Sequence, residues 1–324
     1  MANARLLELL ADGQFHSGEQ LAETLGMTRS AVWKRIRALR ALGLDVYRVP
    51  GRGYRLRDGL ELLDAARIRQ HLPSDLAARL AALEVHDSVD STNAVLLRRD
   101  GPGKPEVCLA EHQSAGRGRR GRRWASPFGA NLYLSLSWTF AELPRDFPAL
   151  ALVVGLAAAD ALATSGVPGV ALKWPNDLQH GGAKLGGILL EMRGEPPGPC
   201  RVVIGIGINV RMPPAFAAAI DQSWTDLAQA TGGAVPSRNA LAAAVITTVI
   251  RALERFEREG FAPFHPAWTK RDALRGRVVT VEGGAGTPFS GEALGIDADG
   301  ALLVRCGAAV RRVVAADVSV RSVA

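Results

Sequence analysis

The apolar positions near the start of the chain recur at the spacing of short helices. They predict a first helix over residues 4–10, a second that begins after Ser17 and ends at Gly26, and a third that begins after Thr28. Ser17 with Gln20 fits a capping box, in which side chain and backbone satisfy each other's hydrogen bonds. The apolar residues of this pattern are Leu6, Leu7, Leu9, Leu10, Leu21, Leu25, Val32, Ile36 and Leu39.

Two short helices joined by a tight turn with glycine are typical of the helix-turn-helix, whose second helix enters the major groove of DNA. Residues 46–56 alternate about Pro50-Gly51, which predicts a basic hairpin beside these helices. We therefore expect a winged helix-turn-helix DNA-binding domain over residues 1–62. A three-helix domain whose basic face is only solvated, or binds protein, is the alternative. The candidate DNA-binding residues are Thr28, Arg29, Ser30, Lys34, Arg37 and Arg52, and Trp33 lies beside them without a predicted role.

The middle of the chain has the mixed pattern of a larger α+β domain, which we place at residues 63–274. A helix is predicted over residues 60–72, where Pro73-Ser74 breaks the pattern. The apolar run Phe147–Ala159 predicts a core helix, because Asp160 interrupts it before the roughly 18 residues that a membrane span needs. Strands are predicted over residues 107–110, 132–138, 170–173, 188–192 and 202–208, and helices over residues 92–98, 147–163 and 238–260.

Short alternating segments separated by glycines fill the end of the chain. They predict strands over residues 278–281, 289–296, 301–305 and 310–314. Such a series is typical of a small β-barrel, which we place at residues 275–324. The chain as a whole is therefore expected to be an α+β multidomain protein.

Composition narrows the class of protein without identifying a partner. The chain has 324 residues, 48% of them hydrophobic and 22% charged, which excludes disordered and collagen-like classes. A formal charge of +7 favours polyanionic partners in general. The three cysteines lack any CxxC spacing, which argues against a zinc site or a disulfide framework. With no signal-peptide pattern and no membrane span, we expect a cytoplasmic protein.

A loop rich in arginine and glycine follows the strand predicted at residues 107–110. Over residues 113–124 its glycines let the backbone wrap closely around a ligand, and its guanidinium groups offer fixed forks for phosphate oxygens. The GxGxxG spacing at Gly116 to Gly121 is not a Rossmann turn, because arginines fill its gaps and no apolar helix follows. A basic surface loop that binds nucleic acid is an equally good interpretation of this segment alone.

Three further segments carry polar groups that suit a ligand. Residues 90–93 open a helix with small hydrogen-bonding side chains, although a simple helix cap has the same pattern. Lys173 and Lys184 can neutralise a phosphate or carboxylate, and Asp177 could hold a hydrated magnesium ion. A strand-end salt bridge is the ordinary alternative for either lysine. The glycine-spaced strand at residues 205–209 lets a ligand lie against its backbone, but alone it also fits a tightly packed core.

Taken in order, these segments resemble the biotin-protein ligase family. The motifs are DSTN at 90–93, QSAGRGRRGRRW at 113–124, SPFGANLYLS at 126–135, KWPND at 173–177, KLGGIL at 184–189 and GIGIN at 205–209. The N-terminal HSGEQLAETLGM and the hairpin PGRGYRL further resemble the bifunctional bacterial form, the biotin operon repressor. The resemblance covers nearly the whole chain, and it implies a class II synthetase-like mixed α/β ligase domain followed by an SH3-like domain.

The resemblance implies a two-step reaction and a second role on DNA. Biotin and ATP would give biotinyl-5′-AMP and diphosphate, and biotin would then pass to a lysine of the biotin carboxyl carrier protein of acetyl-CoA carboxylase. Biotinyl-5′-AMP would also act as corepressor, with the protein bound as a homodimer to the operator of biotin synthesis genes. The implied cofactors are ATP and Mg²⁺, with biotin as substrate.

Carried over motif by motif, the resemblance assigns roles to individual residues. Lys184, Arg119 and Asp177 would be catalytic, Lys184 by meeting the negative charge of the transition state and Asp177 as the metal ligand. Biotin would contact Ser91, Thr92, Asn93, Gln113, Arg117, Gly118, Arg119 and Lys184. ATP and the adenylate would contact Arg117, Arg119, Arg122, Trp124, Lys173, Asn176 and Asn209.

Two other functions would require similar binding residues and domains. A lipoate-protein ligase, or another enzyme that adenylates a carboxylate, would also bind ATP, and substrate-dependent pyrophosphate exchange separates it from a biotin ligase. A ligand-sensing transcription factor with an inactive catalytic domain would bind biotin without making the adenylate. Lys184 and the intact arginine loop argue against that second alternative.

Overall fold

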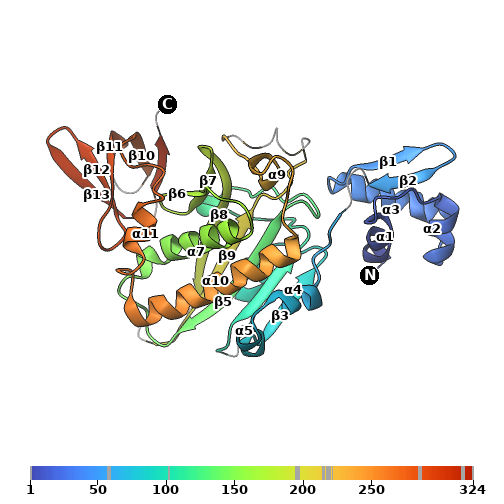
Figure 1. Cartoon of the computed structure of the whole chain (residues 1–324), viewed down its shortest axis with the longest axis horizontal. Coiled ribbons are helices and arrows are strands. Elements are labelled where there is room, and N and C mark those ends of the chain that lie inside the picture. Colours follow the sequence, from blue (N-terminus) through green and yellow to red (C-terminus); the bar gives the residue numbers. More distant parts are fainter. Residues whose placement is uncertain are drawn as a thin grey trace.

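The computed structural model describes residues 2–56, 60–100, 103–193, 198–213, 216, 220, 222–283, 287–314 and 318–322. Figure 1 shows a small N-terminal domain beside a larger central domain, which carries a β module at the C-terminal end of the chain. The secondary structure follows the expected order of a helical domain, a mixed domain and a β domain. The prediction of an α+β multidomain protein is therefore confirmed.

The N-terminal domain is the predicted winged helix-turn-helix. Its capping box forms as expected, because Ser17 Oγ accepts from Gln20 N at 3.0 Å and Ser17 N donates to Gln20 Oε1 at 3.0 Å. Thr28 Oγ1 accepts from Ala31 N at 3.3 Å and caps the third helix. The elements are α1 (Ala2–Leu10), α2 (Gly18–Thr24), α3 (Arg29–Ala41) and the antiparallel pair β1 (Val46–Val49) and β2 (Gly53–Leu56).

The segment that joins this domain to the next is extended where the sequence pattern predicted a helix. Residues 57–59 lie outside the described part of the chain, residues 60–64 are not helical, and α4 (Ala65–His71) begins only after Asp64. Side chains of the central domain hold this linker, since Leu63 N donates to Glu111 Oε1 at 2.6 Å. The prediction of a helix over residues 60–72 was wrong at its start, because tertiary hydrogen bonds satisfy the linker backbone instead.

The central domain is built on a seven-stranded sheet with the order β3-β4-β5-β9-β8-β7-β6. Only the β3–β4 pair is parallel, and the other neighbours are antiparallel. The strands are β3 (Ala82–His86), β4 (Glu106–Ala110), β5 (Leu132–Phe140), β6 (Ala171–Lys173), β7 (Asp177–His180), β8 (Ala183–Arg193) and β9 (Cys200–Ile208). The sequence pattern did not predict β3 or β7, and it placed the start of β8 five residues too late.

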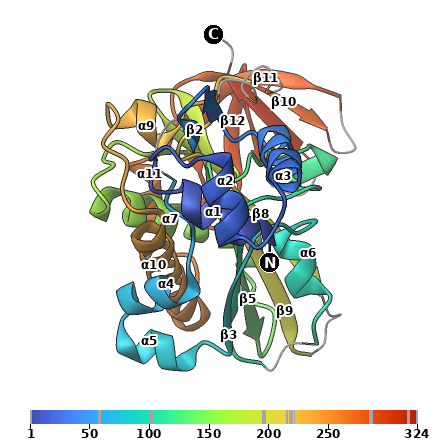
Figure 2. The ribbon, with the colours of Figure 1, turned by 90° about the vertical axis from the view of Figure 1, so that its right-hand side faces the viewer.

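Helices cover one face of this sheet, and one short helix lies on the other. The long helices α7 (Leu150–Thr164) and α10 (Arg238–Glu259) pack together with α4 on the core face, and α6 (Thr92–Leu97) lies on the opposite face (Figures 1 and 2). The apolar helix α7 lies in the core as predicted, although its first turn is the 3₁₀ helix η2 (Phe147–Ala149). The other helices of the described residues are α5 (Ser74–Arg79), η1 (Arg119–Gly121), α9 (Leu227–Ala230) and α11 (His265–Thr269).

A buried ion pair holds the linker and the start of α10 against the sheet. Arg238 Nη2 lies 2.7 Å from Glu111 Oε2, and the two side chains are 6% and 3% exposed. Glu61 caps α10, since it accepts from Arg238 N at 2.6 Å and from Ser237 Oγ at 2.6 Å. Burial raises the pKa of Glu61, but these hydrogen bonds and one from Asn239 outweigh it and leave the pKa below its ordinary value. The linker is thus tied to the central domain by charged groups.

The C-terminal module is a five-stranded antiparallel sheet with the order β13-β12-β11-β10-β14. The expected four strands are present, and a fifth, β14, was not predicted. The module docks on the central domain through the turn at Gly300, whose carbonyl accepts from Trp174 Nε1 at 3.0 Å. The strands are β10 (Val278–Gly283), β11 (Phe289–Ile296), β12 (Leu302–Cys306), β13 (Ala309–Val313) and β14 (Val318–Ser322).

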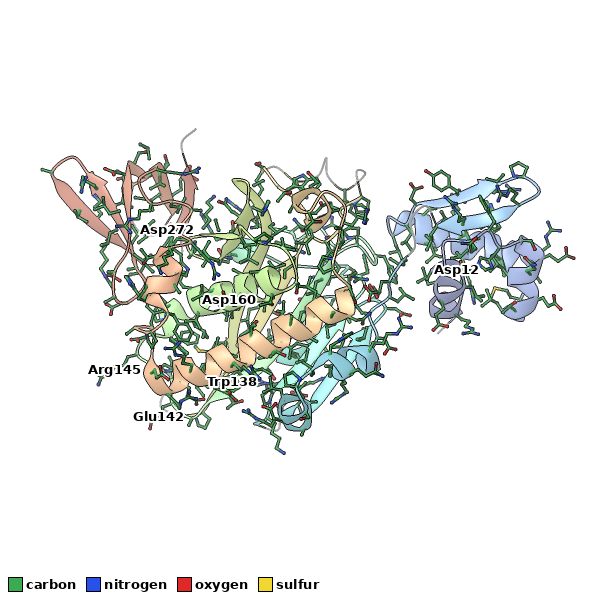
Figure 3. The ribbon with its side chains drawn as sticks, in the orientation of Figure 1. Asp12, Trp138, Glu142, Arg145, Asp160 and Asp272 are labelled. Carbon is green, nitrogen blue, oxygen red and sulfur yellow. The ribbon has the colours of Figure 1, made fainter. Side chains whose placement is uncertain are left out.

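A second contact fixes the base of the C-terminal module to α7. Arg271 donates to Asp160 of α7 at 2.7 Å, and Asp272 follows at the entrance to the module (Figure 3). Asp272 accepts from Leu274 N at 2.9 Å, while burial raises the pKa of its carboxyl. The same segment pairs with β6, since Leu172 N donates to Arg271 O at 2.7 Å and Ala273 N donates to Leu172 O at 2.9 Å, which holds the module close to the strand that ends at Lys173.

Candidate functional site

One large cavity lies on the sheet face that carries α6. Its volume is about 870 Å³, which is near the upper end of the range for small-molecule binding pockets. All the residues predicted for the ligase reaction line it, although they come from segments far apart in the chain. They are Ser91, Thr92, Asn93, Gln113, Arg117, Gly118, Arg119, Arg122, Trp124, Lys173, Asn176, Asp177, Lys184 and Asn209.

Alternation along β9 makes the floor of this cavity. Ile204, Ile206 and Ile208 are buried in the core beneath the sheet, so the glycines between them face the other way. A Cβ atom added to Gly205 would lie 2.5 Å from Asn93 Oδ1, and one added to Gly207 would lie 2.6 Å from the ring of Trp124. The isoleucines on one side of the strand therefore pack in the core, and the glycines on the other side expose the backbone to the cavity.

Buried polar groups form one wall of the cavity. Thr92 N and Thr92 Oγ1 both donate to Gln113 Oε1, at 2.9 and 3.2 Å. Ser135 Oγ lies 2.5 Å from Asn93 Oδ1 and 2.7 Å from Thr92 Oγ1. Because Thr92, Asn93 and Ser135 are buried and these hydrogen bonds orient the groups, the wall offers fixed donors and acceptors to a polar ligand. Thr92, Asn93 and Gln113 were predicted as site residues from the sequence, whereas Ser135 had no predicted role.

Glu191 on β8 connects this wall to the arginine loop. Asn93 Nδ2 donates to Glu191 Oε2 at 2.8 Å, and Arg117 Nη2 lies 3.1 Å from Glu191 Oε1. A carboxylate only accepts hydrogen bonds, so Glu191 fixes which way the Asn93 amide points. Sequence reasoning missed this residue, since a single acidic residue on a strand gives no signal until its partners are known.

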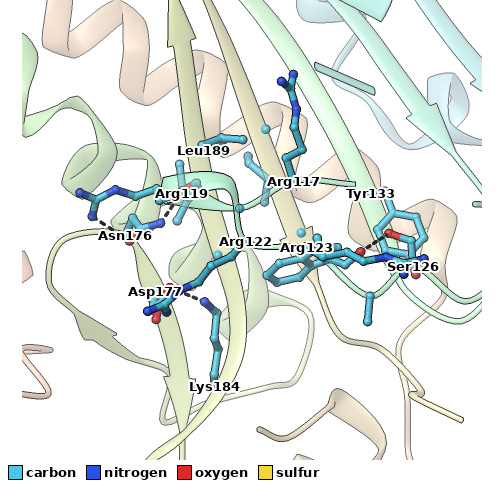
Figure 4. Close-up of a pocket in the computed structure, with 18 of the residues that line it drawn as sticks. Arg117, Arg119, Arg122, Arg123, Ser126, Tyr133, Asn176, Asp177, Lys184 and Leu189 are labelled. Carbon is cyan, nitrogen blue, oxygen red and sulfur yellow. Dashed lines mark hydrogen bonds and ion pairs between the residues drawn. The ribbon is translucent and has the colours of Figure 1, made fainter. Parts of the chain in front are cut away.

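The arginine loop folds into a tight turn over the cavity. Gly118 N donates to Arg122 O at 2.7 Å, and Trp124 N donates to Gly116 O at 2.9 Å. Arg120 has the left-handed conformation, with φ 57°, inside this turn. Arg119 is directed toward Asn176, and Arg117 points away from the Asp177–Lys184 pair (Figure 4). The interpretation as a nucleic-acid-binding surface loop does not fit a loop that forms the roof of a cavity.

A charged pair lies at the end of the cavity opposite the polar wall. Lys184 Nζ lies 2.7 Å from Asp177 Oδ1, and each side chain is 17% exposed. Lys184 Nζ is also 5.6 Å from the centre of the Trp124 ring. Asn176 donates to Ile188 O at 2.7 Å, which directs its Oδ1 toward Arg119. A phosphate placed here would meet cationic groups from two sides.

One carboxylate could serve as a metal ligand at this end of the cavity. Within the described part of the chain, no three His, Cys, Asp or Glu residues gather into a metal site, and Asp177 is the acidic residue among those that line the cavity. Mg²⁺ commonly keeps several waters and binds one or two carboxylates together with substrate phosphates. The residues therefore fit a Mg²⁺ ion that arrives with a nucleotide.

The predicted DNA-binding residues lie on the N-terminal domain, apart from this cavity. Arg29, Ser30, Lys34 and Arg37 are exposed on α3. Thr28 caps the helix with its side chain, and the guanidinium of Arg52 stacks over the Phe15 ring at 4.3 Å. Two residues of the central domain contact the end of α3, since Phe128 N donates to Leu42 O at 3.1 Å and the Phe216 ring lies against Gly43.

Comparison with known proteins follows the same division of the chain. Residues 3–55 match the model of the HTH domain, residues 85–209 the Biotin/lipoate A/B protein ligase family, and residues 276–321 the Biotin protein ligase C terminal domain. The chain is 45% identical over 318 residues to the bifunctional ligase/repressor BirA of Salmonella typhimurium, which covers 98% of this chain and 97% of that protein. It belongs to the bifunctional ligase/repressor BirA family.

Other BirA family members and one solved structure agree with this assignment. The bifunctional ligase/repressor BirA of Bacillus subtilis is 32% identical over 323 residues, which is 97% of both chains. The structure of the biotin protein ligase from Aquifex aeolicus in complex with biotin and ATP has a TM-score of 0.62 and 26% identity, over 76% of this chain and 99% of that one. The prediction of a biotin-protein ligase with an N-terminal DNA-binding domain is confirmed.

Proposed function

We propose that the cavity makes biotinyl-5′-AMP from biotin and ATP, and then passes biotin to a lysine of a biotin carboxyl carrier protein. The observation that carries this proposal is the arrangement of one cavity with a buried polar wall at one end and the Lys184–Asp177 pair at the other. The polar wall suits a neutral amide-like ring, and the charged end suits a phosphate. Biotinyl-5′-AMP has an amide-like ring at one end of its biotin chain and a phosphate at the other end of that chain, which matches the order of the two ends of the cavity.

The polar wall is proposed to bind the ureido ring of biotin. That ring has two N–H donors and one carbonyl acceptor, and the buried Ser91, Thr92 and Asn93 present oxygen and nitrogen atoms to it. Gln113, which is half-buried, adds its amide to this wall. Because Gly205 has no side chain, the Asn93 amide can lie directly against the β9 backbone, which fixes this wall beside the cavity floor. Biotin would then extend its carboxylate toward Lys184.

At the charged end, Lys184 is proposed to stabilise the transition state for adenylation. A carboxylate oxygen of biotin attacks the α-phosphorus of ATP, the bond to the bridging oxygen breaks, and diphosphate leaves with the electron pair. Lys184 and Arg119 would balance the charge that gathers on the phosphorus oxygens. Mg²⁺ held by Asp177 would neutralise the diphosphate. In the second step the carrier amine attacks the acyl carbon, the bond from that carbon to the AMP oxygen breaks, AMP leaves with the electron pair, and the amine nitrogen loses a proton to solvent.

The remaining lining residues are proposed to hold the nucleotide. Trp124 would cover the adenine ring, since its indole already lies on the glycine backbone of β8 and β9. Gly118 gives the loop backbone its close approach. Contacts to ribose and phosphates are proposed for Arg122, Lys173, Asn176 and Asn209.

The N-terminal domain is proposed to bind the operator of biotin synthesis genes when the adenylate is present. Arg29, Ser30, Lys34 and Arg37 lie on the exposed side of α3, and Arg52 lies on the hairpin, which supports this role for residues 1–62. Residues 63–274 would be the ligase domain and residues 275–324 the SH3-like domain. We propose that the protein acts in the cytoplasm, as a homodimer when the adenylate is bound.

The test of the ligase proposal is biotin-dependent exchange of pyrophosphate with ATP, measured on the purified chain. Exchange with biotin and Mg²⁺, but not with lipoate, is the expected result. Exchange with lipoate in place of biotin would favour a lipoate ligase. Biotin binding without any exchange would favour a sensor that has lost catalysis.

Replacement of Glu191 by alanine is expected to raise the KM for biotin about tenfold while kcat changes less than threefold. The change removes a charged acceptor from Asn93 and the ion pair of Arg117, which loosens the wall before chemistry begins. Glu191→Gln keeps an acceptor for Asn93 and should recover most of the KM. Steady-state exchange kinetics measure both variants.

Glu292→Ala is the matched control for that change, because Glu292 pairs with Arg305 on the exposed C-terminal sheet. It should leave both constants unchanged. A fall in kcat with an unchanged KM in Glu191→Ala would show that Glu191 does not position the biotin wall.

A further inference from the structure

The exposed side of α3 has an aromatic residue at its centre. Val32, Ile36 and Leu39 are buried against the other helices, so the opposite side faces solvent. Residues 29, 30, 33, 34 and 37 form this exposed side, at the spacing of one helical face. Trp33 is 45% exposed. Large aromatic side chains that are so exposed on a helix are typical of contact surfaces.

The surroundings of Trp33 determine which kind of partner fits. Arg29 and Arg37 lie one turn before and one turn after it, and Lys34 is adjacent. The Arg37 guanidinium lies 5.7 Å from the centre of the Trp33 ring. An apolar protein surface would have to strip water from these cations without pairing them, which is costly. A polyanion pairs them instead, so duplex DNA is the partner that fits this face.

Within a DNA complex the indole and the cations have different targets. Cationic side chains contact phosphates, which carry no sequence information. The carbon surface of an indole gains nothing from a phosphate, but the major groove displays one apolar group, the C5-methyl of thymine. We propose that Trp33 is a specificity-determining residue that packs against a thymine methyl group in the operator, and that its ring also holds Arg37 in place. This inference rests on the proposed DNA-binding function.

The experiment begins with the full-length protein, biotin, ATP and Mg²⁺, which together select duplexes from a random pool. Each dT of the selected duplex is then replaced by deoxyuridine, which removes only the methyl group. At one or two positions the wild type should lose about fourfold in affinity, the effect of one buried methyl. Trp33→Ala should bind more weakly and should not distinguish dT from deoxyuridine at those positions.

Two variants separate this role from others. Trp33→Phe keeps an apolar ring and should keep the preference for dT. Lys34→Ala should weaken binding equally for both duplexes and lower the salt dependence by about one ion. Pyrophosphate exchange should be the same in all variants, because Trp33 and Lys34 are not among the residues that line the ligase cavity.

Three results would overturn the inference. A Trp33→Ala protein that keeps the wild-type preference for every dT would exclude a methyl contact. Loss of the preference in Lys34→Ala as well as in Trp33→Ala would show that the preference depends on the docking of the whole helix and not on the Trp33 ring. If the wild type selects no duplex, the DNA-binding function itself fails and the inference falls with it, whereas the first two results leave that function intact.

Discussion

Replacement of Lys184 by alanine is expected to lower the kcat of biotin-dependent pyrophosphate exchange by about 10²–10³-fold, the usual effect of removing one preorganised charge-stabilising group. Lys184 Nζ lies at the charged end of the cavity, 2.7 Å from Asp177, where the proposed phosphate would sit. Its charge acts mainly in the transition state, so the KM for biotin should change much less than kcat. Steady-state exchange at saturating ATP separates the two constants.

Lys104→Ala is the matched control, because Lys104 is an exposed lysine that does not line the cavity. It should retain wild-type activity. A Lys184→Ala protein with a raised KM and an unchanged kcat would contradict the proposed role, and would make Lys184 a binding group for biotin alone. Thermal unfolding of both variants should match the wild type, which excludes a folding defect.

Replacement of Arg238 by methionine is expected to lower the free energy of unfolding by about 3–5 kcal/mol, the range found when one partner of a buried ion pair is removed. Glu111, which is 3% exposed, would lose its only cationic partner among the described residues. Arg238 also donates to Glu61 O at 2.8 Å and to Asn131 O at 2.8 Å. Urea unfolding, followed by the fluorescence of the central domain, measures the change.

A second variant on the same helix supplies the comparison. Arg255 of α10 pairs with Glu259 at the surface, with side chains 49% and 42% exposed. Arg255→Met should therefore change stability by less than about 1 kcal/mol. Equal stability of Arg238→Met and Arg255→Met would contradict the prediction. The double variant Glu111→Leu, Arg238→Met should recover part of the loss, because no unpaired charge then remains buried.

Much of the fold could be predicted because local chemistry and tertiary packing agree there. The third helix of the N-terminal domain has a cap at Thr28, an apolar stripe and a polar face, and all three indicate the same element. Strand β9 was predicted because its isoleucines alternate with glycines. Where the local sequence pattern and the tertiary contacts disagree, the prediction from the pattern is wrong. Residues 60–64 look helical, but Glu111 holds them extended.

Short strands were missed for a different reason. Of β3, only Leu83 is buried, and β7 spans only four residues. Strands of this kind lack the run of alternating positions on which the prediction depends. β14 was likewise absent from the prediction, and its pairing with β10 defines it in the structure.

The candidate site was predictable in composition but not in geometry. Its motifs indicated which residue types serve a carboxylate and a phosphate, and the structure brings all of them to one cavity. The pairing of Lys184 with Asp177 and the link from Asn93 through Glu191 to Arg117 depend on strand register, which the sequence does not state. Glu191 and Ser135 therefore came from the structure alone.

The glycines of β9 limit how ligand selectivity can change during evolution or in the laboratory. At Gly205 and Gly207 every substitution adds atoms, and the added atoms meet Asn93 or Trp124. Mutation at the floor can therefore only narrow the cavity, and it cannot widen it. A variant that accepts a bulkier biotin analogue must gain its space from larger residues on the walls and roof, such as Trp124 or Leu189. Libraries for such variants should keep the glycines of the floor constant and randomise residues on the walls and roof.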